Sequence, residues 1–281
     1  MAQQIHWFPG HMKKALNEIE EKIKLVDVVI EILDARAPLS SINPEFEKRI
    51  NNKKKLIVLS KSDLADPIET KKWEIYFKNS GNSLLVLNLT DPKAEKLITQ
   101  EVNKLGEEKH KKEISKGMKP QPIKTMIIGV PNVGKSSLIN RIARRNAAGV
   151  QNKPGYTRGE QFIKVNKDFI LLDTPGVLPM NYEDKKHATN LALLGSIKED
   201  ILPNDELAAN LLKYLSKYYP SALENRFSIT DLSDPIEVAN KVASFRGLIS
   251  SGKPDIEKAY FLILKEFKEG KLGRITLEKT L

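Results

Sequence analysis

A glycine-rich stretch near the middle of the chain has the residue types and spacing of a phosphate-binding loop. Residues 129–136 read Gly-Val-Pro-Asn-Val-Gly-Lys-Ser and match the pattern G-x-x-x-x-G-K-S/T in full. The glycines let successive backbone N–H groups turn inward around phosphates, and a following helix adds its positive end. We expect Lys135 to reach the β- and γ-phosphates and Ser136 to bind Mg²⁺. The other positions of this loop expected to contact nucleotide are Asn132, Val133, Gly134 and Ser137.

Two downstream stretches carry residues that could complete such a site. The sequence Asp-Thr-Pro-Gly at 173–176 ends an apolar run. This placement suits an Asp173 carboxylate acting on Mg²⁺ and a Gly176 N–H facing the γ-phosphate. Between the two motifs, the stretch KPGYTRG contains Thr157, whose hydroxyl could complete the Mg²⁺ shell when a γ-phosphate is present. The predicted Mg²⁺ ligands are Ser136, Thr157 and Asp173.

An earlier stretch, LIVLSKSDLAD at residues 56–66, has the character of a guanine-reading loop. Its Ser-Lys-Ser-Asp resembles the Asn-Lys-x-Asp motif, with Ser60 in the place of Asn. The Asp63 carboxylate could accept from N1–H and the amino group of guanine together, whereas adenine would oppose it with a lone pair. Lys61 would lie along the purine face, and Ser60 would keep one contact that an Asn makes. Because one lost hydrogen bond costs about 0.5–1.5 kcal/mol, we expect guanine selectivity with reduced affinity; a surface turn is the alternative.

The order of these motifs differs from that of an ordinary GTPase, in which the phosphate loop comes first. Here a strand ending at Asp34, the 56–66 stretch and a strand ending at Asn-Leu-Thr, 88–90, precede the phosphate loop. This is the order of a GTPase cut after its D-T-P-G motif and rejoined at its original ends across residues 115–124. A parallel sheet tolerates such a permutation, because its core depends on spatial neighbours and the cuts fall in surface loops.

Composition favours a globular protein with an affinity for polyanions. The chain has 281 residues, 40% hydrophobic and 29% charged, enough for one large or two ordinary domains. It has no cysteine, which excludes disulfides and thiolate metal sites. The net charge of +10 favours nucleic acid, anionic membrane or phosphorylated ligands, although a lysine-rich solvated surface would give the same value. With no apolar run near 20 residues and no apolar signal core at the start, we expect a cytoplasmic protein.

The elements that must position these residues alternate between strands and helices. Residues 13–26 have apolar side chains at helical spacing, and Asn43 followed by Pro44 begins a second helix. Strands are predicted at 28–33, 56–60, 84–87 and 125–128, helices near 68–79 and 93–113, and two more strands around a turn at 166–167. The expected fold class is α/β: a circularly permuted P-loop GTPase domain with a mostly parallel six-stranded sheet and helices on both faces.

The last third of the chain is predicted to be helical. Strand patterns stop after about residue 185, and the apolar spacing from residue 207 to 218 indicates a helix closed by Pro220. A second helix begins at Asp234 and ends at Gly247, and a third begins at Asp255 and ends at Gly270. We therefore predict a GTPase domain over residues 1–184, with a linker at 115–124, and a small all-α domain over residues 185–281.

With these motifs in this order, the chain resembles the circularly permuted, TrmE-Era-like GTPases of the ribosome biogenesis GTPase A (YlqF) family. The resemblance covers nearly the whole chain. It rests on WFPGHM (7–12), DARAPLSSINP (34–44), GVPNVGKSSLINR (129–141), NKPGYTRG (152–159) and LLDTPGV (171–177). Ser60 departs from the Asn that is usual in the family. Asn88 is an expected nucleotide contact only because residues 88–90 loosely match the family's last base-contacting loop.

The resemblance also implies how hydrolysis is arranged. Many GTPases place a Gln directly after D-x-x-G to orient the attacking water, but this chain has Val177 there. His11 matches the family's proposed water-orienting histidine, and Asn132 matches the asparagine that related GTPases use to hold K⁺. The expected catalytic residues are His11, Lys135, Thr157 and Gly176. Taken without the family, a histidine among aromatic residues is more often a structural hydrogen bonder, so both roles stay open for His11.

The function that the resemblance implies is GTP binding and hydrolysis by an assembly factor of the large (50S) ribosomal subunit, slow alone and stimulated by the ribosome. The implied cofactors are GTP or GDP, Mg²⁺ and K⁺. The implied partners are the rRNA and proteins of the large-subunit precursor, bound through the helical domain by a monomeric protein without a membrane partner. The alternatives are a P-loop NTPase or RNA-binding protein acting on another structured RNA, an ATP-dependent kinase, and a non-catalytic RNA binder; the intact motif residues disfavour the last.

Overall fold

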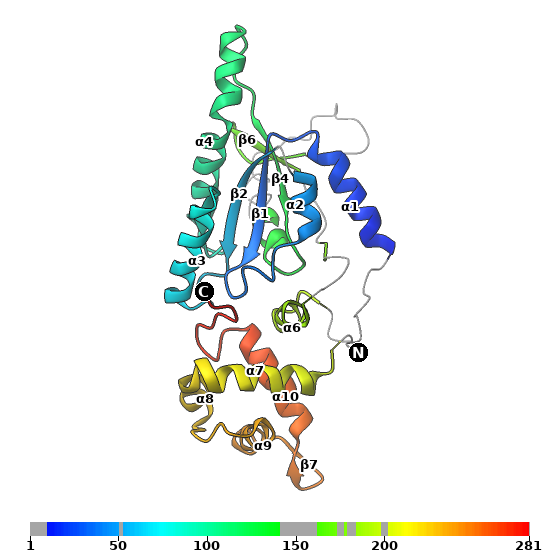
Figure 1. Cartoon of the computed structure of the whole chain (residues 1–281), viewed down its shortest axis with the longest axis vertical. Helices are drawn as coiled ribbons and strands as arrows, with labels where there is room; N and C mark the ends of the chain where they lie inside the picture. Colours follow the sequence, from blue (N-terminus) through cyan, green and yellow to red (C-terminus); the bar gives the residue numbers. More distant parts are fainter. Residues whose placement is uncertain are drawn as a thin grey trace.

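The chain is arranged as a sheet unit and a helical unit that follow each other along the long axis of the molecule (Figure 1). The computed structural model describes residues 10–50, 53–140, 162–172, 177–178, 184–197 and 202–280; their side chains are described from residue 14 and, in the segment after residue 161, from residue 164. Within these ranges, none of the helices combines the length and the apolar character that a bilayer crossing requires.

The sheet unit contains a six-stranded sheet in the order β3-β2-β1-β4-β6-β5. All neighbouring strands are parallel except β5, which pairs antiparallel with β6. This confirms the predicted mostly parallel, six-stranded sheet. The strands are β1 Val28–Asp34, β2 Lys54–Ser60, β3 Ser83–Val86, β4 Ile123–Ile128, β5 Phe162–Lys164 and β6 Phe169–Leu172.

The central strand β1 joins the two halves of the chain, because it pairs with β2 on one side and with β4 on the other. Asp34 at the end of β1 lies level with Ser60 at the end of β2, and Glu31 lies level with Ile128 at the end of β4. The carboxyl ends of parallel strands therefore meet at one edge, which is where ligands bind in open α/β sheets.

Helices cover both faces of the sheet, as predicted. Consecutive residues of a strand point to opposite faces, so Ile57 and Val58 of β2 report on different layers. Ile57 belongs to a buried cluster with Trp73 of α3 (Pro67–Asn79). Val58 belongs to the main core, which includes Ile98 of α4 (Ala94–Ser115). The sheet is thus buried from both sides, which explains why its central strands are apolar runs rather than alternating patterns.

Two further helices precede β2, and both were predicted. The first, α1 (Gly10–Ile23), begins and ends about three residues earlier than the apolar spacing indicated. The second, α2 (Pro44–Ile50), begins as predicted, with the Glu45 N–H donating to Asn43 Oδ1 at 3.0 Å. Asn43 also donates through Nδ2 to Val177 O at 3.0 Å, so this cap connects α2 to the segment that follows the D-T-P-G motif.

The helical unit contains the three predicted helices, α7 (Asn204–Tyr218), α9 (Pro235–Phe245) and α10 (Ile256–Lys268). Among the residues that the structure describes here, two helices were not predicted: α6 (Lys185–Leu193) and α8 (Pro220–Phe227). Pro220 does not only close α7; it occupies the first turn of α8, where its missing N–H costs nothing. The prediction that strands stop near residue 185 is wrong for a short exposed hairpin, β7 (Ile249–Ser250) and β8 (Lys253–Pro254).

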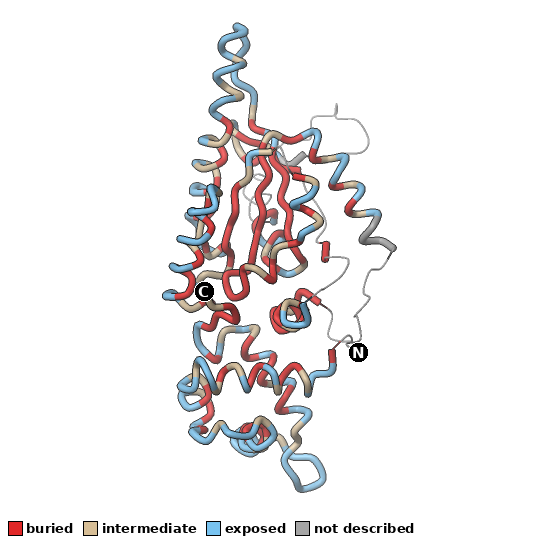
Figure 2. Tube along the Cα trace, in the orientation of Figure 1, coloured by how far each residue is buried: buried red, intermediate tan, exposed pale blue. Residues whose placement is uncertain are grey.

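The chain does not end in the helical unit. After α10 it returns to the sheet unit, and the C-terminus lies beside α3 (Figure 1). Ile275 and Leu277 in this return are 2% exposed, so the segment is part of the packed interior. Figure 2 shows the contrast: the strands and this return are buried, whereas the far end of α4 and the β7–β8 hairpin are exposed.

Candidate functional site

The predicted phosphate loop, residues 129–136 and here called the P-loop, lies between β4 and a helix that covers residues 135–140. Gly129 has φ 151° and Gly134 has φ 106°, and Asn132 is also left-handed with φ 62°. A Cβ on Gly129 would lie 2.5 Å from Ile32 O, a contact that backbone cannot relieve. Glycine is therefore required where the loop passes β1, and the strand–loop–helix context predicted for this motif is confirmed.

Lys135 lies inside the P-loop. Its Nζ donates to Gly129 O at 2.8 Å and to Val130 O at 2.7 Å, and the side chain is buried. The ammonium thus adds positive charge at the centre of the loop, where the predicted phosphates would bind. Ser136 and Ser137 are exposed in the first turn of the following helix. A hydroxyl there is a hard oxygen donor, which fits the Mg²⁺ role predicted for Ser136.

Asn132 connects the P-loop to the helical unit. Its side-chain Nδ2 donates to Gly195 O, in the turn after α6. With the amide in this orientation, its oxygen is the atom available to a cation, so the predicted K⁺ role of Asn132 stays a prediction that this geometry permits.

The stretch around Ser-Lys-Ser-Asp, residues 60–66 and here called the base loop, begins at the end of β2. Ser60 is fully buried, and its hydroxyl oxygen lies 2.6 Å from Val133 O in the P-loop and 2.9 Å from Leu33 O in β1. The one hydroxyl proton is therefore used within the protein. The predicted contact between Ser60 and the base is not favoured by this geometry; instead Ser60 links the base loop to the P-loop, a role that the sequence did not reveal.

Lys61 and Asp63, the other predicted base-reading residues, lie in a tight turn closed by the Leu64 N–H donating to Lys61 O at 2.9 Å. Asp63 is exposed, as a residue that reads a ligand must be. Lys61 has φ 53°, an uncommon conformation for a residue with a side chain, and its Nζ lies 2.9 Å from Asp34 Oδ2. The sequence therefore placed both residues correctly at the sheet edge but did not show what holds Lys61.

Asp34, the last residue of β1, is a buried carboxylate beneath the base loop, and the sequence assigned it no role in the site. Arg36 contacts it through Nη2–Oδ2 at 2.9 Å and Nε–Oδ1 at 3.0 Å. Burial raises the pKa of Asp34, but the charges of Arg36 and Lys61 outweigh it and lower the pKa to about 2. Asp34 is therefore ionised at neutral pH and fixes the Lys61 ammonium. An aspartate at a strand end beside the Ser-Lys-Ser-Asp strand was the available signal.

The loop after β3 also reaches this edge. The Asn88 Oδ1 accepts from Thr90 N at 2.8 Å and from Thr90 Oγ1 at 2.7 Å, which makes a side-chain-stabilised turn. Leu89 in this turn is buried, and its Cδ1 lies 3.0 Å from where a Cβ on Gly134 would stand. The loop predicted to provide the last base contact therefore packs against the P-loop, and the contact itself stays a prediction.

Several predicted site residues lie outside what the structure describes. These are Thr157, Asp173, Gly176 and the side chain of His11, whose backbone is the second residue of α1. Val177, directly after the D-T-P-G motif, is described, and its side chain is fully buried. An aliphatic side chain buried in the core cannot orient water, so the usual glutamine function must be performed by another group.

Comparisons with known proteins agree with this geometry. A family model described as "50S ribosome-binding GTPase" matches residues 124–223, a range that begins in β4 and includes the P-loop. Ribosome biogenesis GTPase A from Bacillus cereus is 42% identical to this chain, over 98% of this chain and 93% of the relative. Mitochondrial ribosome-associated GTPase 1 from mouse is 33% identical over 97% of this chain and 90% of that protein.

Solved structures of YlqF share the fold over nearly the full length. A structure described as GDP-bound TM YlqF superposes with a TM-score of 0.69 at 27% sequence identity and covers 93% of this chain and 98% of its own. A crystal structure of GNP-bound YlqF from T. maritima has a TM-score of 0.66 at 27% identity and covers 95% of this chain and 98% of its own.

Proposed function

Because the chain belongs to the ribosome biogenesis GTPase A family and is a circularly permuted GTPase, we propose that it assembles the large (50S) ribosomal subunit and that the ribosome stimulates its slow hydrolysis of GTP. In this proposal it works as a cytoplasmic monomer, with a GTPase domain over residues 1–184 and an all-α domain over residues 185–281. The GTP form binds the precursor and hydrolysis releases it.

The observation that carries the proposal is the convergence of three loops at one sheet edge. The P-loop follows β4, the base loop follows β2 and the turn at residues 88–90 follows β3. Ser60 and Leu89 link the base loop and the last turn directly to the P-loop. This convergence supports a site in which phosphate-binding and base-reading groups would face one ligand, with the Asp63 carboxylate favouring guanine over adenine.

The chemistry proposed for the site is attack of water on the γ-phosphate, giving GDP and phosphate. Backbone N–H groups around Gly134 and the Lys135 ammonium would bind the phosphates, as electrostatic stabilisation of phosphoryl transfer requires. Ser136, Thr157 and Asp173 would hold Mg²⁺, which would neutralise the charge of the phosphates. Gly176 would contact the γ-phosphate through its N–H.

The sequence has no glutamine after the D-T-P-G motif to orient the attacking water, so another group must do this. Val177 is buried and aliphatic, so we assign this role to His11 and the extra positive charge to K⁺ at Asn132. His11 lies in α1, and the side chain of Asn132 donates to the turn after α6, so both roles involve segments outside the P-loop. A partner that orders these segments would therefore raise the rate, which is the physical basis of the proposed ribosome stimulation.

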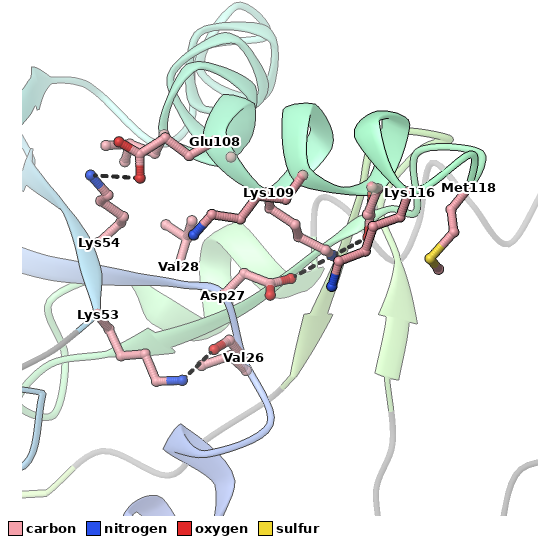
Figure 3. A pocket seen from close by; sticks show the side chains of 13 residues that line it. Val26, Asp27, Val28, Lys53, Lys54, Glu108, Lys109, Lys116 and Met118 are labelled. Carbon is pink, nitrogen blue, oxygen red and sulfur yellow. Dashed lines mark hydrogen bonds and ion pairs between the residues drawn. The ribbon is translucent and has the colours of Figure 1, made fainter.

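The charge distribution supports an RNA partner and suggests which surface it contacts. Residues 185–281 carry fifteen Lys and Arg against thirteen Asp and Glu, so most of the +10 net charge lies in residues 1–184. There, a cavity of about 490 Å³ opens at the sheet end opposite the P-loop, between α4 and the start of β1. This cavity, here called the groove, is lined by five lysines with three acidic residues among them (Figure 3). The lysines are Lys53, Lys54, Lys109, Lys112 and Lys116. We propose that rRNA contacts this groove as well as the helical domain.

Measuring GTP hydrolysis with and without purified large subunits, in K⁺ and in Na⁺, tests the main proposal. We expect slow hydrolysis alone, stimulation by large subunits that is greater in K⁺, and little stimulation of His11→Ala. Equal rates with and without subunits in both salts would contradict the assembly-switch proposal. ATP competing with GTP at similar concentrations would contradict the guanine reading.

The groove is tested by co-sedimentation of Lys112→Glu/Lys116→Glu with large subunits at several salt concentrations. We expect weaker association and a shallower salt dependence, because each phosphate contact adds about one to the salt slope. The matched control is Lys71→Glu/Lys78→Glu, which makes the same change of charge at two exposed positions of α3. Equal weakening by both pairs would show a net-charge effect and contradict a specific groove.

A further inference from the structure

The segment that returns from α10 to the sheet unit lies directly against the base loop. This segment, residues 274–279 and here called the C-terminal strap, follows a turn at Gly270 with φ 74°. At Gly270, a Cβ would stand 2.6 Å from Leu64 Cδ2, so the base loop packs on the turn as closely as a glycine permits. The strap also contacts the helical unit, α3, Arg36 and the loop at residues 39–40.

The strap makes four hydrogen bonds to the backbone of the base loop. Arg274 donates through Nη2 to Ser62 O and through Nε to Ala65 O, both at 2.8 Å. The Ile275 N–H donates to Leu64 O at 3.0 Å. The Asp66 N–H donates to Thr276 Oγ1 at 3.1 Å. The strap therefore contacts the residue before Asp63 and the three residues after it, while Asp63 itself is exposed.

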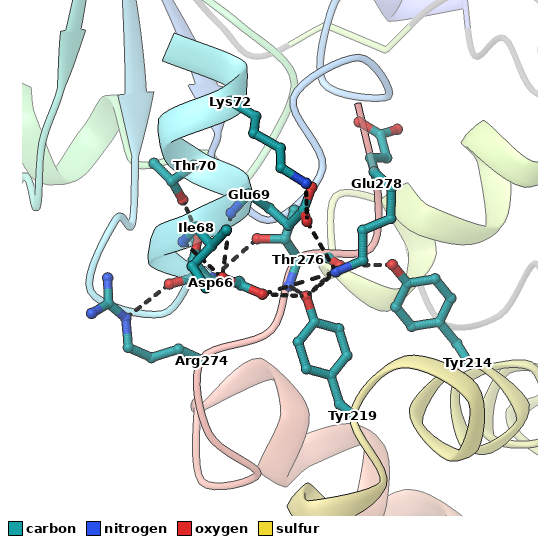
Figure 4. A network of polar contacts seen from close by, with 12 residues as sticks. Asp66, Ile68, Glu69, Thr70, Lys72, Tyr214, Tyr219, Arg274, Thr276 and Glu278 are labelled. Carbon is teal, nitrogen blue, oxygen red and sulfur yellow. Dashed lines mark hydrogen bonds and ion pairs between the residues drawn. The ribbon is translucent and has the colours of Figure 1, made fainter. Parts of the chain in front are cut away.

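A second set of contacts connects the strap to the helical unit (Figure 4). The Tyr219 hydroxyl donates to Asp66 Oδ2 at 2.9 Å and accepts from Lys279 Nζ at 2.9 Å. The Tyr214 hydroxyl donates to Thr276 O at 2.8 Å. Thr276 therefore lies between the base loop and the two tyrosines, so a movement of the end of α7 would be transmitted to residue 66.

The far end of the strap holds the loop that precedes α2. The Glu278 carboxylate is buried and accepts from the backbone N–H groups of Leu39 at 2.7 Å and Ser40 at 2.9 Å. It also accepts from the Ser40 hydroxyl and from Asn190 Nδ2 of α6, the latter at 3.3 Å. These four donors balance the buried negative charge, so the strap is anchored at both ends rather than resting on the surface.

The base loop needs this support because its own sequence does not stabilise its shape. Lys61 is held in a left-handed conformation that persists only when surrounding contacts impose it. The turn that carries Asp63 has one internal backbone hydrogen bond, Leu64 N–H to Lys61 O. The Arg274 guanidinium spans two carbonyls with fixed geometry, which a lysine ammonium does not reproduce.

We propose that the C-terminal strap holds the base loop in its guanine-binding shape, with Arg274 as the positioning residue, and that it makes nucleotide affinity depend on the helical unit. This rests on the proposed reading of guanine by Asp63. Contacts made at the helical unit by a partner would shift the strap and change how fast nucleotide leaves. Arg274 acts through the Ser62 and Ala65 carbonyls and not by touching the nucleotide.

The experiment measures GDP affinity and dissociation rate by fluorescent-nucleotide titration and stopped flow on the full chain. For Arg274→Ala we expect GDP to bind about tenfold more weakly, mainly through faster dissociation, because two hydrogen bonds from a charged donor are lost. Arg274→Lys keeps the charge and should recover only part of the affinity. Lys271→Ala, whose ion pair with Glu269 lies on the surface, removes a cation three residues away and should behave as wild type.

A purely structural role for Arg274 would lower thermal stability without changing nucleotide dissociation at a temperature where every variant is folded. That result, or GDP affinity equal to wild type in Arg274→Ala, overturns the inference. If the proposed reading of guanine is wrong, the experiment gives a different result, because wild type itself would then bind ATP as well as GTP. Adenine binding by wild type is thus distinguishable from an inert Arg274.

The connection to the helical unit is tested by Tyr219→Phe, which removes the hydroxyl between Asp66 and Lys279. We expect faster GDP dissociation, by about threefold, because the hydrogen bond by which the helical unit reaches Asp66 of the base loop is lost. Tyr218→Phe is the matched control, because that neighbouring ring is exposed and interacts through its face with Lys217. Equal dissociation rates in Tyr219→Phe and wild type would overturn the dependence on the helical unit.

Discussion

The P-loop and the base loop lie at the same edge of one sheet, yet different parts of the chain hold them in shape. The P-loop is stabilised from within: Lys135 donates to the carbonyls of Gly129 and Val130, and its glycines adopt the left-handed angles the turn needs. The base loop depends on Arg274 and Thr276, which are more than 200 positions away in sequence. The contacts that stabilise the P-loop lie within its own motif, so they can be predicted from the sequence. The contacts that stabilise the base loop come from distant residues, so its motif alone does not predict them.

The two loops are nevertheless connected through single contacts. Ser60 joins the base loop to Val133 of the P-loop. Asp34 of the neighbouring strand β1 holds only Lys61 of the base loop. If the two loops are stabilised in these different ways, a substitution in the P-loop should distort the loop itself and abolish nucleotide binding. A substitution in the base loop or in its distant partners should only weaken nucleotide binding, to an extent that depends on the contact removed.

The largest effect is expected for Gly129→Ala. The new Cβ would stand 2.5 Å from Ile32 O, a backbone atom that cannot move away without disturbing β1. We expect loss of measurable GDP binding and a free energy of unfolding lower by about 3 kcal/mol, measured by titration and denaturant unfolding. Gly81→Ala is the control, since its φ is also positive but no atom lies within 4 Å; it should cost about 1 kcal/mol and leave GDP binding intact.

Asp63→Asn should give the next largest effect, on selectivity rather than on the fold. An amide offers guanine one acceptor and one donor where two acceptors are needed, so the GTP-over-ATP preference should fall by about a hundredfold. Competition binding with GTP and ATP measures it. Asp231→Asn, an exposed aspartate of the helical unit, makes the same substitution and should not alter the preference. An unchanged GTP-over-ATP ratio in Asp63→Asn would mean that another group reads the base.

Asp34→Asn should lower stability in a way that depends on pH. The folded pKa of Asp34 is about 2, below the ordinary 3.8, so the ionised carboxylate stabilises the fold. This contribution is fully present above about pH 4 and is lost as pH falls through 2. We expect Asp34→Asn to reduce the free energy of unfolding by about 2 kcal/mol at pH 7, with the difference closing between pH 4 and 2. A pH-independent difference in denaturant unfolding would contradict the assignment.

The smallest effect is expected for Ser60→Ala, which removes the contact between the two loops. The loss of one buried hydroxyl bond should cost about 1 kcal/mol of stability and weaken GDP binding about threefold. Ser62→Ala is the control, because that serine contributes its backbone carbonyl, not its hydroxyl, to the Arg274 contact. If GDP binding is unaffected in Ser60→Ala while stability falls, the loops are coupled in the fold but not in ligand binding.

Most of the sheet unit could be predicted from the sequence, because its signals are short in range. Apolar runs such as β1 and β2 mark buried parallel strands, and Asn43 followed by Pro44 marks the start of α2. The permuted motif order was sufficient to predict the sheet type. The helical unit was predicted less well: α8 begins at the proline taken to end α7, and β7 and β8 are two residues each, too short for any periodicity.

The sequence by itself determined the chemistry available to this protein: the P-loop with Lys135, Asp63 directly after an apolar strand pattern, and an aliphatic Val177 where a glutamine is common. Only the tertiary structure decided that Ser60 bonds to the P-loop, that Asp34 holds Lys61 and that the C-terminal strap supports the base loop. The physical reason is the range of the interactions. Helix, strand and turn patterns arise from neighbours within a few residues, so they appear as regular spacings in the sequence. A hydrogen bond between Arg274 and the Ser62 carbonyl joins distant positions and leaves no such pattern.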